Sequence, residues 1–192
     1  MLSYNSRILE KVKLLLDKID RFGIEINETK EVTNSILSFE MNTIDLEEEE
    51  NQIRYYYNRY VEDYDRRSDL EKDHYNFLSA FLIHKLKEIQ YFHHLDKDDY
   101  TSRKNVIWSN DCISSIQFLH REDKNILNIF IRSSDVLRLL PIDLLYGIKL
   151  LNIVLDRFNI KKTNNDLVTF FTTSSHFYIK DQEVVNKIIH GL

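Results

Sequence analysis

Hydrophobic and polar positions repeat with two different periods along the chain, and the change of period separates expected helices from expected strands. In residues 6–20 apolar side chains recur every three to four positions, which predicts an amphipathic helix. In residues 30–41 the period falls to two, with two serines breaking it, so we expect one bulged strand. Residues 74–92 and 142–158 return to helical spacing, and Pro141 suits the first turn of the second of these helices.

The remaining apolar runs are short, which favours strands over helices. Strands are expected at residues 105–108, 126–131, 168–171 and 176–179. Residues 112–120 are followed by a tight link at 121–124, which leads into the strand at 126–131. The run Glu47 to Glu50 is typical of a solvated helix start, and the tyrosine-rich segment after it is expected to line the core. These elements predict an α+β fold, with one mixed, twisted sheet and flanking helices.

Composition narrows the classes of protein. The 192 residues fit a single domain, and 26 basic against 31 acidic residues do not give the basic surface of a nucleic-acid-binding protein. Three glycines are too few for a glycine-rich phosphate loop, and one cysteine, Cys112, excludes a disulfide framework. No signal peptide or membrane-spanning stretch is visible, so we expect a soluble, cytoplasmic protein with no membrane partner.

Four segments in the second half of the chain carry the candidate chemistry. They are Ser102-Arg103-Lys104, Cys112 with Gln117-Phe118, Arg132-Ser133-Ser134-Asp135 continuing to Leu140-Pro141-Ile142-Asp143, and Ser175-His176-Phe177-Tyr178. In this order and spacing they resemble the thymidylate synthase and pyrimidine hydroxymethylase family. The resemblance covers residues 101–181 well, whereas residues 1–100 are divergent. It implies a thymidylate-synthase-like fold across the whole chain.

The resemblance implies a nucleophile and a phosphate site. Cys112 matches the cysteine that adds to C6 of the pyrimidine and so activates C5. Arg132 and Ser133 match phosphate ligands of the same chain. Arg103 and Lys104 match the basic pair that reaches the phosphate from the other subunit of a homodimer. The one-carbon donor would be 5,10-methylenetetrahydrofolate.

The resemblance also implies residues that hold the base and the sugar. Gln117 and Asp135 match base-site positions, and His176 and Tyr178 match the pair at the sugar 3′-hydroxyl. Asp143 stands where enzymes acting on uracil carry asparagine and enzymes acting on cytosine carry aspartate. A protonated carboxyl can donate to N3 of cytosine and accept from its amine, which needs a pKa raised by burial. The expected substrate is therefore dCMP rather than dUMP.

The folate side of the family's pattern is eroded. The helix that carries a tryptophan and a catalytic glutamate in the family is compressed here, and only Glu50 and Glu62 are candidates. Thr172 and Thr173 replace two glycines, and Leu139 replaces a third. Two hypotheses follow: a compact folate-dependent C5 transferase, most simply a hydroxymethylase, or a non-catalytic relative that binds a pyrimidine nucleotide or serves as a partner subunit.

Each site residue also has a structural interpretation when taken alone. Cys112 fits an inert buried residue, Arg132 a surface ion-pair donor, and His176 a core histidine. Only their combination favours a nucleotide site. His93 and His94 are adjacent at a helix end and rarely converge on one ion, so no metal site is expected.

Overall fold

The structure, a computed structural model, describes residues 6–61, 102–103, 105–108 and 112–191. The elements in order are α1 (Arg7–Phe22), β1 (Ile24–Ile26), β2 (Thr29–Glu40), η1 (Met41–Thr43), α2 (Leu46–Tyr60), β3 (Val106–Trp108), β4 (Ile113–Arg121), β5 (Lys124–Asp135), α4 (Leu140–Arg157), β6 (Leu167–Tyr178), η2 (Ile179–Asp181) and α5 (Gln182–His190). The strands form one sheet in the order β1-β2-β6-β5-β4-β3. Strands β5 and β6 are parallel and the other neighbours antiparallel. The α+β class, with one mixed sheet and flanking helices, is confirmed.

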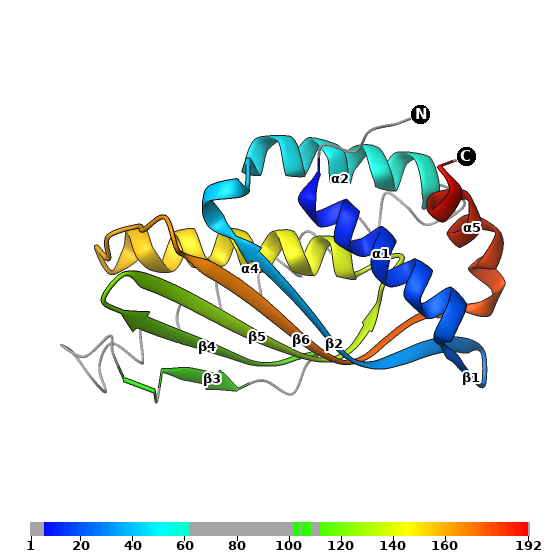
Figure 1. Ribbon diagram of the computed structural model, residues 1–192, viewed down its shortest axis with the longest axis horizontal. Helices are drawn as coiled ribbons and strands as arrows, with labels where there is room; N and C mark the ends of the chain where they lie inside the picture. Colours follow the sequence, from blue (N-terminus) through cyan, green and yellow to red (C-terminus); the bar gives the residue numbers. More distant parts are fainter. Residues whose placement is uncertain (1–5, 62–101, 104, 109–111, 192) are drawn as a thin grey trace.

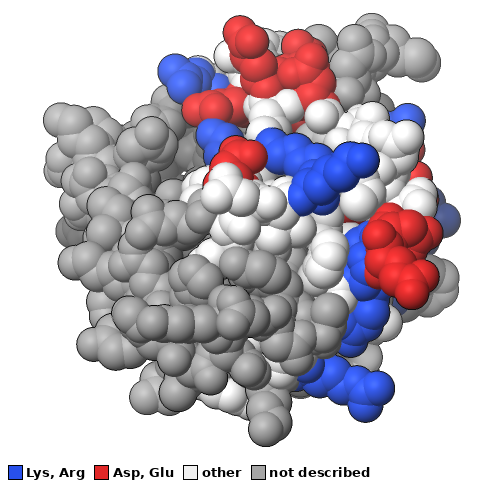
Figure 2. Space-filling view, turned by 90° about the vertical axis from the view of Figure 1, so that its left-hand side faces the viewer, with Lys and Arg blue, Asp and Glu red and all other residues white. Residues whose placement is uncertain are grey.

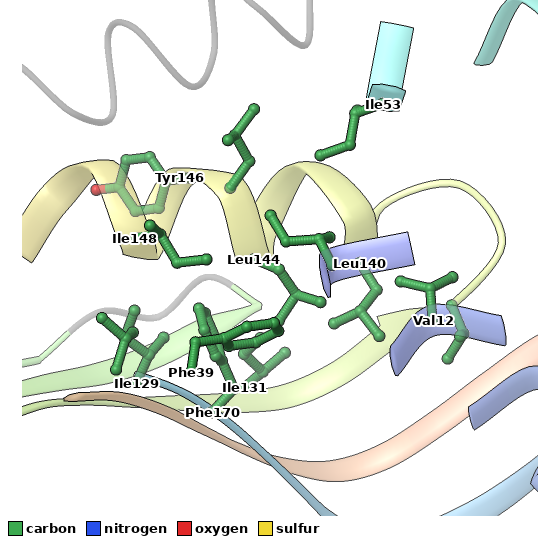
Figure 3. Close-up of a cluster of buried hydrophobic side chains, with 14 of the residues drawn as sticks. Val12, Phe39, Ile53, Ile129, Ile131, Leu140, Leu144, Tyr146, Ile148 and Phe170 are labelled. Carbon is green, nitrogen blue, oxygen red and sulfur yellow. The ribbon is translucent and has the colours of Figure 1, made fainter. Parts of the chain in front are cut away.

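The described helices lie on one face of the sheet (Figure 1). Helix α4 lies along β5 and β6, and Leu140, Leu144 and Ile148 point from it toward the sheet (Figure 3). Helix α4 can approach Phe170 of β6 closely because Gly147 has no side chain. A Cβ at position 147 would lie 2.5 Å from Cζ of Phe170. Burial of these apolar side chains is the main stabilising contribution to the fold.

Helix α1 begins where its sequence predicts, and a carboxylate from another helix also binds its N-terminus. Ser6 is the N-cap, and its Oγ accepts from the amide of Leu9. Glu49 of α2 is only 2% exposed, and its carboxylate accepts from Ser6 Oγ at 2.5 Å and from the amide of Arg7 at 2.6 Å. The prediction of a fully solvated acidic run is therefore wrong at Glu49, because this carboxylate satisfies the unpaired amides at the start of α1.

The tyrosines of α2 line the core, as predicted, at two positions. Tyr56 and Tyr60 are buried, while Tyr55 is exposed. The hydroxyl of Tyr56 donates to the carbonyl of Leu137 at 2.9 Å, and Tyr57 donates in the same way to the carbonyl of the next residue, Arg138. Helix α2 therefore holds the turn that follows β5.

The last two predicted strands, residues 168–171 and 176–179, are one continuous strand, β6. The hydroxyl-rich residues between them form no break, because β6 is central and has ladder partners on both sides, in β2 and β5. Strand β5 likewise extends beyond its predicted end to Asp135. Strand β1 and helix α5 were not predicted. The predicted helix at residues 74–92 lies outside the described residues.

The prediction of a bulge in β2 is wrong, because the strand instead contains a single residue with a left-handed backbone conformation. Asn34 has a φ of 56°, a left-handed conformation that asparagine tolerates better than most residues. The pairing of β2 with β6 keeps the same register on both sides of Asn34, from Thr33↔Ser174 to Ser35↔Thr172. No extra residue is inserted.

Candidate functional site

Strands β4 and β5 bring the candidate nucleophile beside a candidate phosphate ligand. Cys112 immediately precedes β4, and its carbonyl accepts a hydrogen bond of 2.8 Å from the amide of Arg132 on β5. Cys112 is a free, exposed cysteine, and Arg132 is exposed as well. The alternative of an inert buried cysteine is therefore excluded.

Strands β5 and β6 bring the third and fourth segments together. Ser133 Oγ lies 3.5 Å from Nδ1 of His176, and Asp135 is directly opposite His176 in the parallel ladder. The rings of His176 and Tyr178 meet edge to face, with centroids 5.8 Å apart. Three of the four predicted segments therefore lie on three neighbouring strands, β4, β5 and β6.

The carboxylate of Asp135 closes the turn after β5. It accepts from the amides of Leu137 and Arg138 at 3.0 and 3.1 Å, and from Nη1 of Arg138 at 3.3 Å. Burial raises the pKa of Asp135, and the charge of Arg138 and its hydrogen bonds oppose that rise. The side chain of Asp135 is thus occupied in holding the turn beside His176.

Arg138 links this turn to the end of β6. Its guanidinium binds both carboxylate oxygens of Asp181, at 2.6 and 2.7 Å, and lies 5.8 Å from the ring centroid of Tyr178. Sequence reasoning did not identify Arg138 or Asp181. One signal could have indicated Arg138: it is the single charged residue in the apolar run that precedes Pro141. A charged side chain at a buried position usually has an ion-pair partner.

Asp143 lies in the first turn of α4 and is 9% exposed. Burial raises the pKa of its carboxyl from 3.8 to about 7. Within the described part of the chain no hydrogen bond or ion pair to this carboxyl is found, so nothing offsets the effect of burial. The group is mostly protonated below neutral pH, as donation to N3 of cytosine requires.

Two predicted site residues lie far along the sheet from Cys112. The amide of Gln117 donates to the carbonyl of Arg103 at 3.1 Å and accepts from Asn128 at 3.3 Å. Gln117 is five residues beyond Cys112 on β4, or roughly 16 Å along an extended strand. Arg103 is therefore not brought beside Arg132 within one chain. Lys104 lies outside the described residues.

The folate-side candidates do not fit a folate. Glu50 is held by Lys149, with Nζ 2.6 Å from its carboxylate. Thr172 is buried, and both threonines carry a side chain where the resemblance implies glycine. Leu139, at the third such position, is 37% exposed. Glu62 lies outside the described residues.

The described surface and helices bear on three classes of partner: nucleic acids, membranes and metal ions. Acidic and basic side chains interleave on the end of the molecule shown in Figure 2, without a continuous basic surface among its described residues. None of the described helices has the length and apolar character needed to cross a membrane. The part of the chain that the structure describes contains no group of three or more His, Cys, Asp or Glu residues suited to a metal ion.

No family model matches the chain, and no curated protein matches it in sequence. The resemblance to thymidylate synthases and pyrimidine hydroxymethylases therefore rests on the four segments and their spacing.

Proposed function

We propose that the chain binds a pyrimidine nucleoside monophosphate, with dCMP preferred, and transfers a one-carbon unit to C5 through a covalent adduct between Cys112 and C6. The observation that carries this proposal is the backbone hydrogen bond that sets exposed Cys112 beside exposed Arg132. A reducing cytoplasm is the proposed location, because the chemistry needs a free thiol.

The chemistry at the ring follows from the thiol. The Cys112 thiolate forms the S–C6 bond, and the C5–C6 π electrons move toward C5, which becomes nucleophilic. C5 takes up an electrophile and loses its original proton; expulsion of the thiolate then restores the double bond. Arg132 and Ser133 would hold the phosphate, the former through a bidentate guanidinium contact. In water alone the same addition exchanges the C5 hydrogen with solvent.

Recognition of the base would depend on Asp143. Its protonated carboxyl would donate to N3 of cytosine and accept from the exocyclic amine. Uracil presents the reverse pattern, with a donor at N3 and an acceptor at O4. The burial and raised pKa of Asp143 support the choice of cytosine over uracil.

The test is the exchange of the C5 hydrogen of dCMP and dUMP in deuterated buffer, followed by NMR. We expect exchange with wild type, faster with dCMP, and a loss of at least a hundredfold in Cys112→Ser. Ser114→Ala, two positions along the chain, is the control and should retain exchange. Exchange that persists in Cys112→Ser would contradict the proposal.

The second hypothesis is a protein that binds a pyrimidine nucleotide, or acts as a partner subunit, without catalysis. The ion pair of Glu50 with Lys149 favours it, because this glutamate is not free to act on a folate. The two hypotheses differ in one result. A nucleotide that raises the melting temperature while its C5 hydrogen never exchanges would establish binding alone.

A homodimer belongs to the proposal. Ile129 and Ile131 point to the helices and are buried, so Phe130 between them points to the face that carries no described helix. Phe130 stacks on Phe171 with ring centroids 4.8 Å apart, and the same cross-strand row ends at Trp108, which is 75% exposed. A second copy packed on this apolar row would bury it. The remoteness of Arg103 from Arg132 also supports supply of Arg103 by a partner.

A further inference from the structure

A carboxylate on β2 lies beside the proposed sugar site, although β2 contributes none of the four motif segments. Glu31 is directly opposite His176 in the antiparallel ladder of β2 and β6. The two strands run side by side as the second and third strands of the sheet (Figure 1). Directly opposed residues present their side chains on the same face, with Cβ atoms about 5 Å apart. Glu31 therefore shares a face with His176.

Two hydroxyl groups connect Glu31 to the same row. Oε2 of Glu31 accepts from Ser174 Oγ at 2.7 Å. Ser174 is opposite Ser133 in the parallel ladder, and Ser133 Oγ lies 3.5 Å from Nδ1 of His176. Glu31, Ser174 and His176 are all partly exposed, so a ligand can reach them. The result is a polar surface of a carboxylate, two hydroxyls and an imidazole across β2, β6 and β5.

The charged residues near Glu31 are paired with other groups, so the Glu31 carboxylate can accept a hydrogen bond from a ligand. Lys30, the next residue on β2, is directed to α1, where its Nζ donates to the carbonyl of Asp20 and lies 3.6 Å from the carboxylate of Asp20. Asp135, on the other side of His176, is held by Arg138. Among the described residues, the hydrogen bond from Ser174 is the only one to the Glu31 carboxylate, and it uses a single oxygen.

We infer that Glu31 is a specificity-determining residue that accepts a hydrogen bond from the sugar 3′-hydroxyl, beside His176 and Tyr178. The inference rests on the proposed nucleotide site and adds a residue to it. A carboxylate only accepts hydrogen bonds, so it suits a hydroxyl donor, and it would repel a phosphate at that position. The site would therefore select nucleotides with a free 3′-hydroxyl over 3′-phosphorylated or 3′-deoxygenated ones.

The test is a double-mutant cycle between the protein and the nucleotide. Calorimetric titrations of the full chain would use dCMP or dUMP, whichever wild type binds more tightly, and its 2′,3′-dideoxy counterpart. Glu31→Gln keeps the size of the side chain and an acceptor for Ser174 but removes the charge. Hydrogen bonds to charged groups contribute enough that we expect at least a tenfold loss of affinity for the deoxynucleotide. For the dideoxynucleotide we expect less than a twofold change.

Glu25→Gln is the matched control, because Glu25 is an exposed glutamate on the neighbouring strand β1. It should bind both nucleotides as wild type does. Glu31→Asp, which retains the charge on a shorter side chain, is the second variant if Glu31→Gln melts at a lower temperature, and it should show the same selective loss. Equal losses for the two nucleotides, or none, would overturn the inference while leaving the proposed function intact. Failure of wild type to bind either deoxynucleotide would overturn the proposed function, and the inference with it.

Discussion

Replacing Asp143 with asparagine should change how the stability of the protein depends on pH. Asp143 is 9% exposed, and its pKa is raised from 3.8 to about 7 by burial. Below pH 3.8 the carboxyl is protonated in both the folded and unfolded states, so the stabilising contribution of the raised pKa is fully present. As the pH rises toward 7, the unfolded chain releases this proton while the folded protein retains it. The contribution is then lost, and the loss is complete above about pH 7.

The magnitude follows from the difference between the two pKa values. A rise from 3.8 to about 7 is roughly three pKa units, each equivalent to ~1.36 kcal/mol, which gives about 4 kcal/mol. The first turn of α4 favours the ionised form through the helix dipole, by up to ~1 kcal/mol. Burial is therefore the larger effect. Relative to wild type, Asp143→Asn should gain about 3 kcal/mol of unfolding free energy between pH 4 and pH 7.5.

Urea unfolding followed by far-UV circular dichroism at half-unit pH steps would measure this difference. The free energy of Asp143→Asn minus that of wild type should rise steadily from pH 4 to pH 7 and stay constant above. Asp156→Asn is the control, because Asp156 is an exposed carboxylate near the other end of the same helix. Parallel stability curves for wild type and Asp143→Asn would show that burial does not perturb this carboxyl and would remove the basis for the choice of cytosine.

Two further predictions concern packing and assembly. Gly147→Ala should destabilise the protein by about 2 kcal/mol, because the new Cβ would lie 2.4 Å from Cδ1 of Ile129. Calorimetry should show a Tm lower by roughly 4–8 °C. An unchanged Tm would contradict the close approach of α4 to the sheet. Trp108→Ser should shift the protein from dimer toward monomer in sedimentation velocity, because Trp108 is 75% exposed on the row that also contains Phe130 and Phe171. A wild-type protein that sediments as a monomer at every concentration would contradict the dimer.

The regular elements with one buried face were predictable from the sequence. The helix in residues 6–20 and the helix after Pro141 are present, because an apolar stripe at helical spacing has few other solutions. The long apolar and polar alternation in residues 30–41 likewise predicted a strand, which is β2. Strand β1 was missed because its alternation is only three residues long, and all three residues are exposed, so no buried face marks it. The continuity of β6 was missed because it depends on partners on both sides.

The candidate site was predictable only where its residues belong to the four segments with recognisable order and spacing. The order and spacing of the segments indicated Cys112, Arg132 and His176 as a group. The structure pairs Cys112 with Arg132, and Ser133 with His176. Contacts between distant segments left no local signal. Glu31 is 145 positions from His176 in the chain, and only the β2–β6 register makes them neighbours. From the sequence around it, a glutamate in a strand such as Glu31 cannot be distinguished from an ordinary exposed residue.

The geometry of the site depends on a register that is fixed at the far end of β5 and β6. The two strands keep one offset from Ile126↔Leu167 to Asp135↔His176, so a slip of one residue would turn His176 away from Asp135. Asp166, just before β6, accepts from the amide and the side chain of Asn125 at 3.0 and 2.8 Å. Because Asp166 is 2% exposed and Asn125 is fully buried, this pairing holds the two strands at the same offset one position before the first ladder pair. A polar contact about ten residues from His176 therefore determines which side chains meet at the proposed sugar site.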